Sequence, residues 1–143
     1  MKIHQISLFA ENKPGQLLAP VQLLAGQGID ISSLFLADTE QYGVLRMIVS
    51  DWRKAAELLE GNGFVIKVTE VLAVEVADQP GGLAGVLTAL DGAGINVEYM
   101  YAFPIACDDR AILIFRFNDP DAAIERLQSA GFNLLHSGEL LER

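Results

Sequence analysis

The chain has 143 residues and a formal net charge of −9, with 51 % hydrophobic residues and a single cysteine. This apolar content favours a folded protein over a disordered one, and the acidic balance without a basic stripe disfavours binding to nucleic acid or an anionic membrane. The apolar runs are far shorter than the roughly 20 residues of a membrane span, the start lacks a signal-peptide pattern, and Cys107 has no partner for an internal disulfide. We therefore expect a cytoplasmic protein.

The first elements are a strand and a helix. Residues 3–9 are rich in Ile, Leu and Phe and predict a strand. Asn12 follows and is expected to cap the next helix with its side chain, and the helical spacing of apolar residues continues to about Gly26. Because Pro20 falls inside this helix, we expect a lost backbone hydrogen bond and a kink or an irregular first turn.

Two β-rich segments come next, at residues 29–38 and 43–50, and the turn at residues 39–42 between them predicts a hairpin. Asp51 is expected to cap a second helix, and a final strand begins at Phe64. The order strand, helix, strand, strand, helix, strand is typical of the split βαβ or ferredoxin-like fold. In this α+β fold two helices cover one face of an antiparallel sheet.

The same pattern then occurs a second time. Two motifs recur at an offset of 66 residues, namely Asn12-Lys13-Pro14-Gly15-Gln16-Leu17 as Asp78-Gln79-Pro80-Gly81-Gly82-Leu83, and Gly28-Ile29-Asp30-Ile31 as Gly94-Ile95-Asn96-Val97. Later landmarks recur at an offset of 68, among them Gly63-Phe64 as Gly131-Phe132, which places two extra residues near positions 106–109. A repeat of this length indicates two copies of one unit, so we expect domains at residues 1–70 and 71–143.

The two copies are joined without a flexible linker. Residues 64–76 are almost all β-formers and contain no Gly, Pro or Ser. We expect one long bent strand or two strands that meet at a corner near Glu70, and in both cases rigid coupling. A unit of about 70 residues is marginal on its own, so each copy is expected to pack on the other. In the second copy Asp119 is expected to cap a helix with Pro120 at its first position.

The first repeated motif has the chemistry of an anion site. Pro fixes the turn between a strand and a helix, and Gly lets another group approach the backbone. The first amides of the helix lack internal partners, and their partial positive charge stabilises a carboxylate by about 0.3–2 kcal/mol. In the second motif Asn96 offers a donor and an acceptor, and Asp30 offers a charge for an ammonium group. An anion site beside such polar groups is what a zwitterionic amino acid requires.

These two motifs, present twice at matched spacing, resemble the ACT domain, a small regulatory module of amino-acid metabolism. The resemblance covers essentially the whole chain, as two tandem ACT domains with no enzyme attached. It implies ferredoxin-like folds paired into one continuous sheet, with effector amino acids bound at the interface between domains. The implied ligand-facing positions are Asp78, Pro80, Gly81, Gly82, Leu83, Asn96 and Val97 in the second copy, and Asn12, Pro14, Gly15, Gln16, Leu17, Asp30 and Ile31 in the first.

The second copy is the better candidate for a ligand site. The first departs from the commonest ACT pattern at Asn12 and Asp30, where Asp and Asn respectively are more typical. Simpler roles stay open: Asn12 and Asp78 as helix caps, Asn96 as the start of a strand through a side-chain turn, and the Pro-Gly pair as a tight turn. Gly82 costs a helix about 1 kcal/mol relative to alanine, which indicates that room is needed at this position.

Three functions follow from these observations. The first is a stand-alone regulatory protein that binds an amino-acid effector with micromolar to millimolar affinity. The second is a protein-interaction subunit that regulates a separate metabolic enzyme and needs no ligand. The third, an enzyme, requires a clustered acid, base or nucleophile, but His4, His136 and Cys107 have neither metal-ligand nor nucleophile–base spacing. We therefore expect no catalysis, no metal and no cofactor, while a homodimer is compatible with the sequence.

Overall fold

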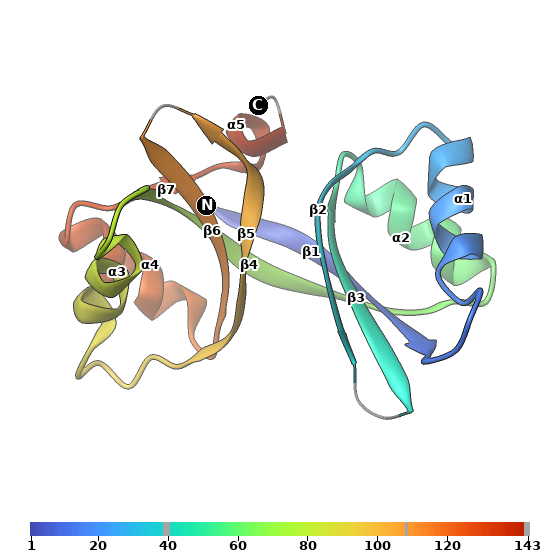
Figure 1. Ribbon diagram of the computed structural model, residues 1–143, viewed down its shortest axis with the longest axis horizontal. Coiled ribbons are helices and arrows are strands. Elements are labelled where there is room, and N and C mark those ends of the chain that lie inside the picture. Colours follow the sequence, from blue (N-terminus) through green and yellow to red (C-terminus); the bar gives the residue numbers. More distant parts are fainter. Residues whose placement is uncertain (39–40, 108, 142–143) are drawn as a thin grey trace. The chain divides into compact units, whose positions relative to one another are not determined.

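The computed structural model describes residues 1–38, 41–107 and 109–141 and shows an α+β fold with seven strands and five helices in this part of the chain. Thr39, Glu40 and Asp108, which belong to the predicted turns, lie outside the described residues. The chain forms two compact units (Figure 1): residues 4–69, called the first-copy unit, and residues 1–3 with 70–143, called the second-copy unit. None of the described helices is long and apolar enough to cross a membrane.

The first-copy unit has the predicted order of elements. These are β1 (Lys2–Glu11), α1 (Leu18–Gly26), β2 (Ile31–Asp38), β3 (Tyr42–Val49), α2 (Trp52–Gly61) and the start of β4 (Val65–Ala77). The strands lie in the order β2-β3-β1-β4, as in a ferredoxin-like fold, and β3 runs antiparallel to both β1 and β2. Leu24 of α1 and Leu59 of α2 pack with Ile6, Leu8 and Met47 of the sheet in one buried core.

The second-copy unit repeats this arrangement. After β4 come α3 (Gly82–Leu90), β5 (Val97–Cys107), β6 (Arg110–Phe117), α4 (Pro120–Ser129), β7 (Asn133–Leu135) and α5 (Ser137–Leu141). The strand order is β7-β4-β6-β5, with each neighbouring pair antiparallel. Helices α3 and α4 cover one face of these strands (Figure 1), where Val86 and Leu127 pack with Phe115 and Phe117 in a second buried core. The predicted α+β class and the two ferredoxin-like units are confirmed.

The junction between the copies is a single strand. Residues 65–77 form the unbroken strand β4, which is the first of the two predicted arrangements. Residues 65–69 of β4 belong to the first-copy unit and residues 70–77 to the second-copy unit. The last strand of one repeat and the first strand of the next are therefore continuous.

In the second-copy unit, the first residues of β1 are tied to α4. The Lys2 ammonium lies 2.9 Å from the Asp121 carboxylate, and this hydrogen bond raises the pKa of Lys2 above its usual value of 10.5. A raised pKa means that the contact stabilises the fold while the lysine is charged and is lost as the pH rises through that pKa. The ion pair between Lys2 and Asp121 is therefore present at neutral pH.

The predicted capping by Asn12 and Asp78 is wrong. Helix α1 has Leu17 at its N-cap and α3 has Gly81, and neither helix receives a side-chain cap. The Pro-Gly turn separates each polar residue from its helix, which begins six residues after Asn12 and four after Asp78. An N-cap side chain reaches only the amides two or three residues ahead, so neither polar side chain stands at a capping position.

Helix α1 also begins two residues later, in repeat terms, than its counterpart α3, because Leu18 is the equivalent of Ala84. Pro20 consequently falls in the first turn of α1, where backbone amides have no intrahelical acceptor. The predicted loss of a hydrogen bond at Pro20 is therefore wrong: at this position the ring removes no intrahelical bond.

The caps predicted at Asp51 and Asp119 are confirmed, because their carboxylates accept the amides of Lys54 at 3.2 Å and Ala122 at 3.1 Å. We expect Asp119→Ala to lower the free energy of unfolding by about 1 kcal/mol, measured by urea denaturation. Asp78→Ala is the matched control and should change the stability by less than about 0.5 kcal/mol, since a surface residue without a cap contributes little. Equal losses in the two variants would contradict this assignment.

Candidate functional site

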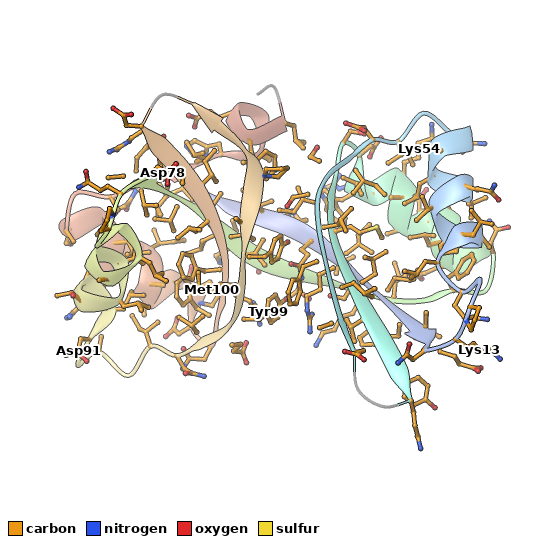
Figure 2. The ribbon with its side chains drawn as sticks, in the orientation of Figure 1. Lys13, Lys54, Asp78, Asp91, Tyr99 and Met100 are labelled. Atoms are coloured by element: carbon orange, nitrogen blue, oxygen red, sulfur yellow. The ribbon has the colours of Figure 1, made fainter. Side chains whose placement is uncertain are left out.

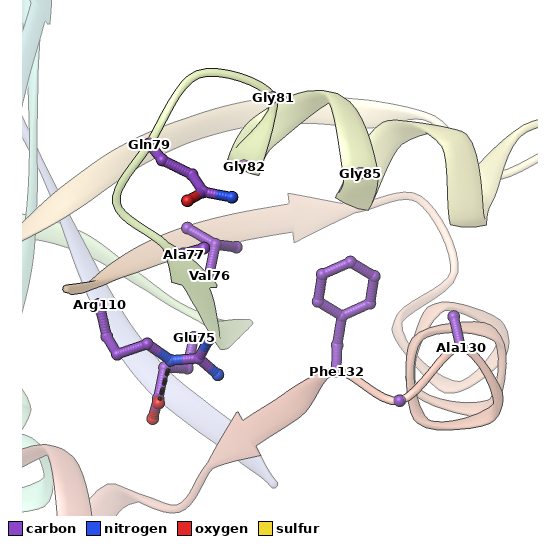
Figure 3. A pocket seen from close by; sticks show the side chains of 11 residues that line it. Glu75, Val76, Ala77, Gln79, Gly81, Gly82, Gly85, Arg110, Ala130 and Phe132 are labelled. Carbon is purple, nitrogen blue, oxygen red and sulfur yellow. Dashed lines mark hydrogen bonds and ion pairs between the residues drawn. The ribbon is translucent and has the colours of Figure 1, made fainter.

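A cavity of about 280 Å³ opens beside the Pro-Gly loop of the second-copy unit (Figure 3). It is bounded by the end of β4, the loop and first turn of α3, the start of β6 and the Gly131-Phe132 pair that follows α4. Gly81 and Gly82 of the predicted ligand-facing set line it. The repeated loop therefore borders a space that a small molecule can enter.

A charged pair forms one side of this cavity. Arg110 donates from Nε to Oε1 of Glu75 at 2.9 Å, and Asn133 donates from Nδ2 to Oε2 of the same carboxylate at 3.2 Å. The Glu75 side chain is only 15 % exposed, whereas that of Arg110 is 49 % exposed. A carboxylate this far from water requires such partners, so Glu75 is held in one place while Arg110 reaches solvent.

The opposite side is apolar. The ring of Phe132 lies against the first turn of α3, where a Cβ built on Gly85 would approach the ring to 3.6 Å. Val76 and the polar side chain of Gln79 also line the cavity, between the loop and the sheet (Figure 3). The lining of the cavity thus includes charged, amide and aromatic side chains.

The start of α3 presents backbone donors. Gly81 has a φ of 92°, a conformation that favours glycine, and it places the loop at the N-terminal end of the helix. The amide of Gly82 donates to the carbonyl of Gln79 at 3.1 Å. No acceptor is recorded, among the residues that the structure describes, for the amides of Leu83 and Ala84. Such amides emerge from the end of a helix with partial positive charge.

The reason for glycine at position 82 is packing against the strand. A Cβ at Gly82 would overlap the backbone carbonyl oxygen of Ala77 at the end of β4. Room is needed here, as predicted, but it is the room that lets the first turn of α3 lie against β4. The first copy has Gln16 at this position, and there the helix begins later, at Leu18.

The second motif lies at the other end of α3. Figure 2 shows Asp78 beside one end of this helix and Asp91 at the other, and Asn96 and Val97 follow Asp91 at the start of β5. Helix α3 has nine residues and is about 13 Å long. One small ligand therefore cannot contact both Gly81 and Asn96 within this unit. Asn96 is held there by Asn118, whose side-chain oxygen accepts its amide at 2.7 Å.

The first copy repeats this separation. Asp30, followed by Ile31 as the first residue of β2, is bridged to Ser50 by its amide at 3.0 Å and its carbonyl at 2.9 Å. It lies at the end of α1 far from the Pro-Gly loop. The other predicted residues of this copy follow the loop into α1: exposed Asn12, Pro14 and Gly15, then partly buried Gln16 and Leu17.

A second cavity, of about 490 Å³, opens in the first-copy unit. Its lining includes Phe9, Gln16, Tyr42, Phe64 and Val65. By the repeat offsets of 66 and 68, these positions correspond in order to Glu75, Gly82, Arg110, Phe132 and Asn133. Four of these five counterparts line the cavity of the second-copy unit, and the fifth, Asn133, is bonded to its Glu75. The two cavities therefore occupy the same place in the two copies of the fold.

Sequence reasoning missed most of the residues around these cavities. Glu75, Arg110 and Phe132 were not among the predicted site residues, although the Gly-Phe landmark of the repeat already marked positions 64 and 132. That landmark was the available signal. Residues that recur at fixed offsets without an evident turn or capping role are candidates for a shared cavity wall.

Comparison with known proteins identifies the family of the chain. The family model of the ACT domain pair matches residues 1–142. The crystal structure of protein BT0572 from Bacteroides thetaiotaomicron has a TM-score of 0.92 and 36 % sequence identity, and the match covers 100 % of this chain and 98 % of that one. No curated protein sequence matches the chain.

More distant structures share the fold. The ligand-free regulatory subunit of aspartate kinase from Thermus thermophilus has a TM-score of 0.62 at 21 % identity, covering 90 % of this chain and 92 % of that one. The corresponding subunit from Thermus flavus has a TM-score of 0.61 at 20 % identity, covering 91 % and 94 %. With the family model matched over nearly every residue, this chain belongs to the ACT domain pair family.

Proposed function

We propose that this chain is a regulatory protein that binds a free amino acid, with the ligand's carboxylate at the N-terminal end of α3. The observation that carries this proposal is the cavity beside Gly81 and Gly82, which brings loop, helix start and charged side chains together in one unit. Amides at a helix start favour an anion by about 0.3–2 kcal/mol. The cavity of about 280 Å³ falls below the range of about 300–1,000 Å³ for drug-sized ligands, which suits a smaller molecule.

Membership of the ACT domain pair family supports a regulatory role rather than catalysis. Proteins with the same fold include regulatory subunits of aspartate kinase. By analogy, the effector is an amino acid and the regulated partner is a separate enzyme of amino-acid metabolism in the cytoplasm. A ligand of about nine heavy atoms binds with micromolar to millimolar affinity, which suits the sensing of a metabolite pool.

A second candidate is a protein-interaction subunit that acts without a ligand. It is favoured by Leu34 and Leu36, which are 56 % and 49 % exposed on the outer strand β2 of the first-copy unit. Exposed apolar side chains on such a strand are suited to contact with another protein. This candidate predicts that the chain co-purifies with an enzyme, and that adding any amino acid does not change this co-purification.

Thermal unfolding in the presence of each of the twenty amino acids tests the proposed function. A ligand present at 100 times its Kd stabilises the native state by about 2.7 kcal/mol, so we expect at least one amino acid at about 10 mM to raise the Tm by several degrees. Sodium chloride at the same concentration is the control for ionic strength. An unchanged Tm with all twenty would contradict amino-acid binding and favour the second candidate.

A further inference from the structure

The two repeat-equivalent cavities differ in the charge of the side chains that line them. Glu75 and Arg110 stand where the first copy has Phe9 and Tyr42, which are 40 % and 55 % exposed. Asn133, which holds Glu75, corresponds to Val65, which is 65 % exposed. The same place in the fold therefore holds a charged pair in one unit and two aromatic side chains with one aliphatic side chain in the other.

The charged pair matches both ends of a zwitterion. Arg110 uses Nε for Glu75, and its two terminal nitrogens have no acceptor recorded within the described part of the chain. Those nitrogens can bind a carboxylate with two parallel hydrogen bonds. An ionised carboxylate has about four acceptor sites, so Glu75 can accept an ammonium group in addition to the partners that it already has.

The burial of Glu75 makes this recognition selective. Its side chain is 15 % exposed, and charges shielded from water interact more strongly than charges at the surface. A ligand that places only a carboxylate in the cavity brings a like charge close to Glu75 without the compensating ammonium. The pair therefore favours a zwitterion over a simple acid of the same shape.

Among the residues that the structure describes, the first-copy cavity has no such shielded charged pair. Glu11 lines it and pairs with Lys13 at 2.8 Å, but the two side chains are 61 % and 55 % exposed. Water screens a surface pair of this kind and leaves it little binding energy. The remaining wall near Phe9 and Tyr42 is aromatic.

We propose that Glu75 and Arg110 recognise the ammonium and carboxylate groups of the amino acid, and that the chain binds one such ligand, in the second-copy cavity. This proposal rests on the proposed function. The carboxylate lies between Arg110 and the start of α3, and the ammonium lies at Glu75. The first-copy cavity does not take part in zwitterion binding.

Calorimetric titration tests this proposal, with the amino acid that raises the Tm most and its deaminated carboxylic acid as probes. We expect one site per chain, and at least about tenfold weaker binding of the amino acid to Glu75→Gln and to Arg110→Met, since charge-assisted hydrogen bonds are lost. Phe9→Leu changes the equivalent position of the other unit and is the matched control, with unchanged affinity.

The affinity for the deaminated acid, compared with that for the amino acid, would not depend on Glu75 if this residue had only a structural role. The native protein should prefer the amino acid by about tenfold or more, and Glu75→Gln should lose this preference, because the ammonium no longer meets a charge. Thermal unfolding of each variant without ligand shows whether it is folded. If Glu75→Gln does not fold, Arg110→Met still tests the proposal, because it alters a side chain that is half exposed.

Two sites per chain, or an unchanged preference in Glu75→Gln, would overturn this assignment while leaving amino-acid binding intact. Unchanged affinity of a folded Arg110→Met would do the same. Failure of every amino acid to bind the native protein would instead overturn the proposed function itself.

Discussion

Gly82→Ala is expected to lower the free energy of unfolding by about 1–3 kcal/mol, the usual cost of forcing extra atoms into a packed site. The new Cβ would overlap the carbonyl oxygen of Ala77, and a backbone atom of a strand cannot move aside as the end of a flexible side chain can. Helix propensity alone predicts the opposite sign, because alanine is better than glycine in a helix by about 1 kcal/mol. The sign of the change therefore decides between packing and propensity.

Urea denaturation of Gly82→Ala measures this effect, and Gly26→Ala provides the matched control. Gly26 ends α1, has no positive φ, and has nothing within 4 Å of the position of a Cβ. We expect the control to be as stable as the native protein or slightly more stable. If Gly82→Ala also proved at least as stable as the native protein, the close packing of α3 on β4 would be refuted.

Phe115→Ala is expected to cost about 3–5 kcal/mol, which is typical of removing a large aromatic side chain from a core. Phe115 is fully buried, and its ring stacks on that of Phe117 with centroids 5.2 Å apart. Such aromatic pairs add about 0.5–1.5 kcal/mol beyond their buried area. The loss falls on the core that holds α3 and α4 against the sheet.

Circular dichroism during urea denaturation measures the effect of Phe115→Ala, with Leu87→Ala as the control. Leu87 lies on α3 but is 43 % exposed, so its truncation should cost less than about 1 kcal/mol. Trp52 is the only tryptophan and lies in the first-copy unit, so its fluorescence follows that unit separately. A loss below 1 kcal/mol for Phe115→Ala would contradict the assigned core.

Local features of the fold were predictable from the sequence. Asp51 and Asp119 cap their helices because each stands immediately before the first helical residue. Asn12 and Asp78 have the same chemistry, but a Pro-Gly turn moves the helix start beyond their reach. The type of residue was informative, whereas its distance from the helix start depended on how the turn folds.

The candidate site was predictable only in part. The Pro-Gly loop identified one wall of the cavity, at Gly81 and Gly82. The contact between Glu75 and Arg110 joins residues 35 positions apart and depends on the register of β4 with β6, in which Arg110 pairs with Ala77. Residues two apart on a strand share a face, so this register, which one sequence does not reveal, places Glu75 diagonally beside Arg110.

Amide chemical shifts of ¹⁵N-labelled protein, titrated with the amino acid that stabilises it most, show whether that amino acid binds at the start of α3. Binding there should produce large shifts for the amides of Leu83 and Ala84, which have no acceptor within the described residues. The repeat-equivalent amides of Leu17 and Leu18 should stay unchanged. Saturating ligand that leaves Leu83 and Ala84 unshifted, or that shifts Leu17 and Leu18 instead, would contradict binding at the start of α3.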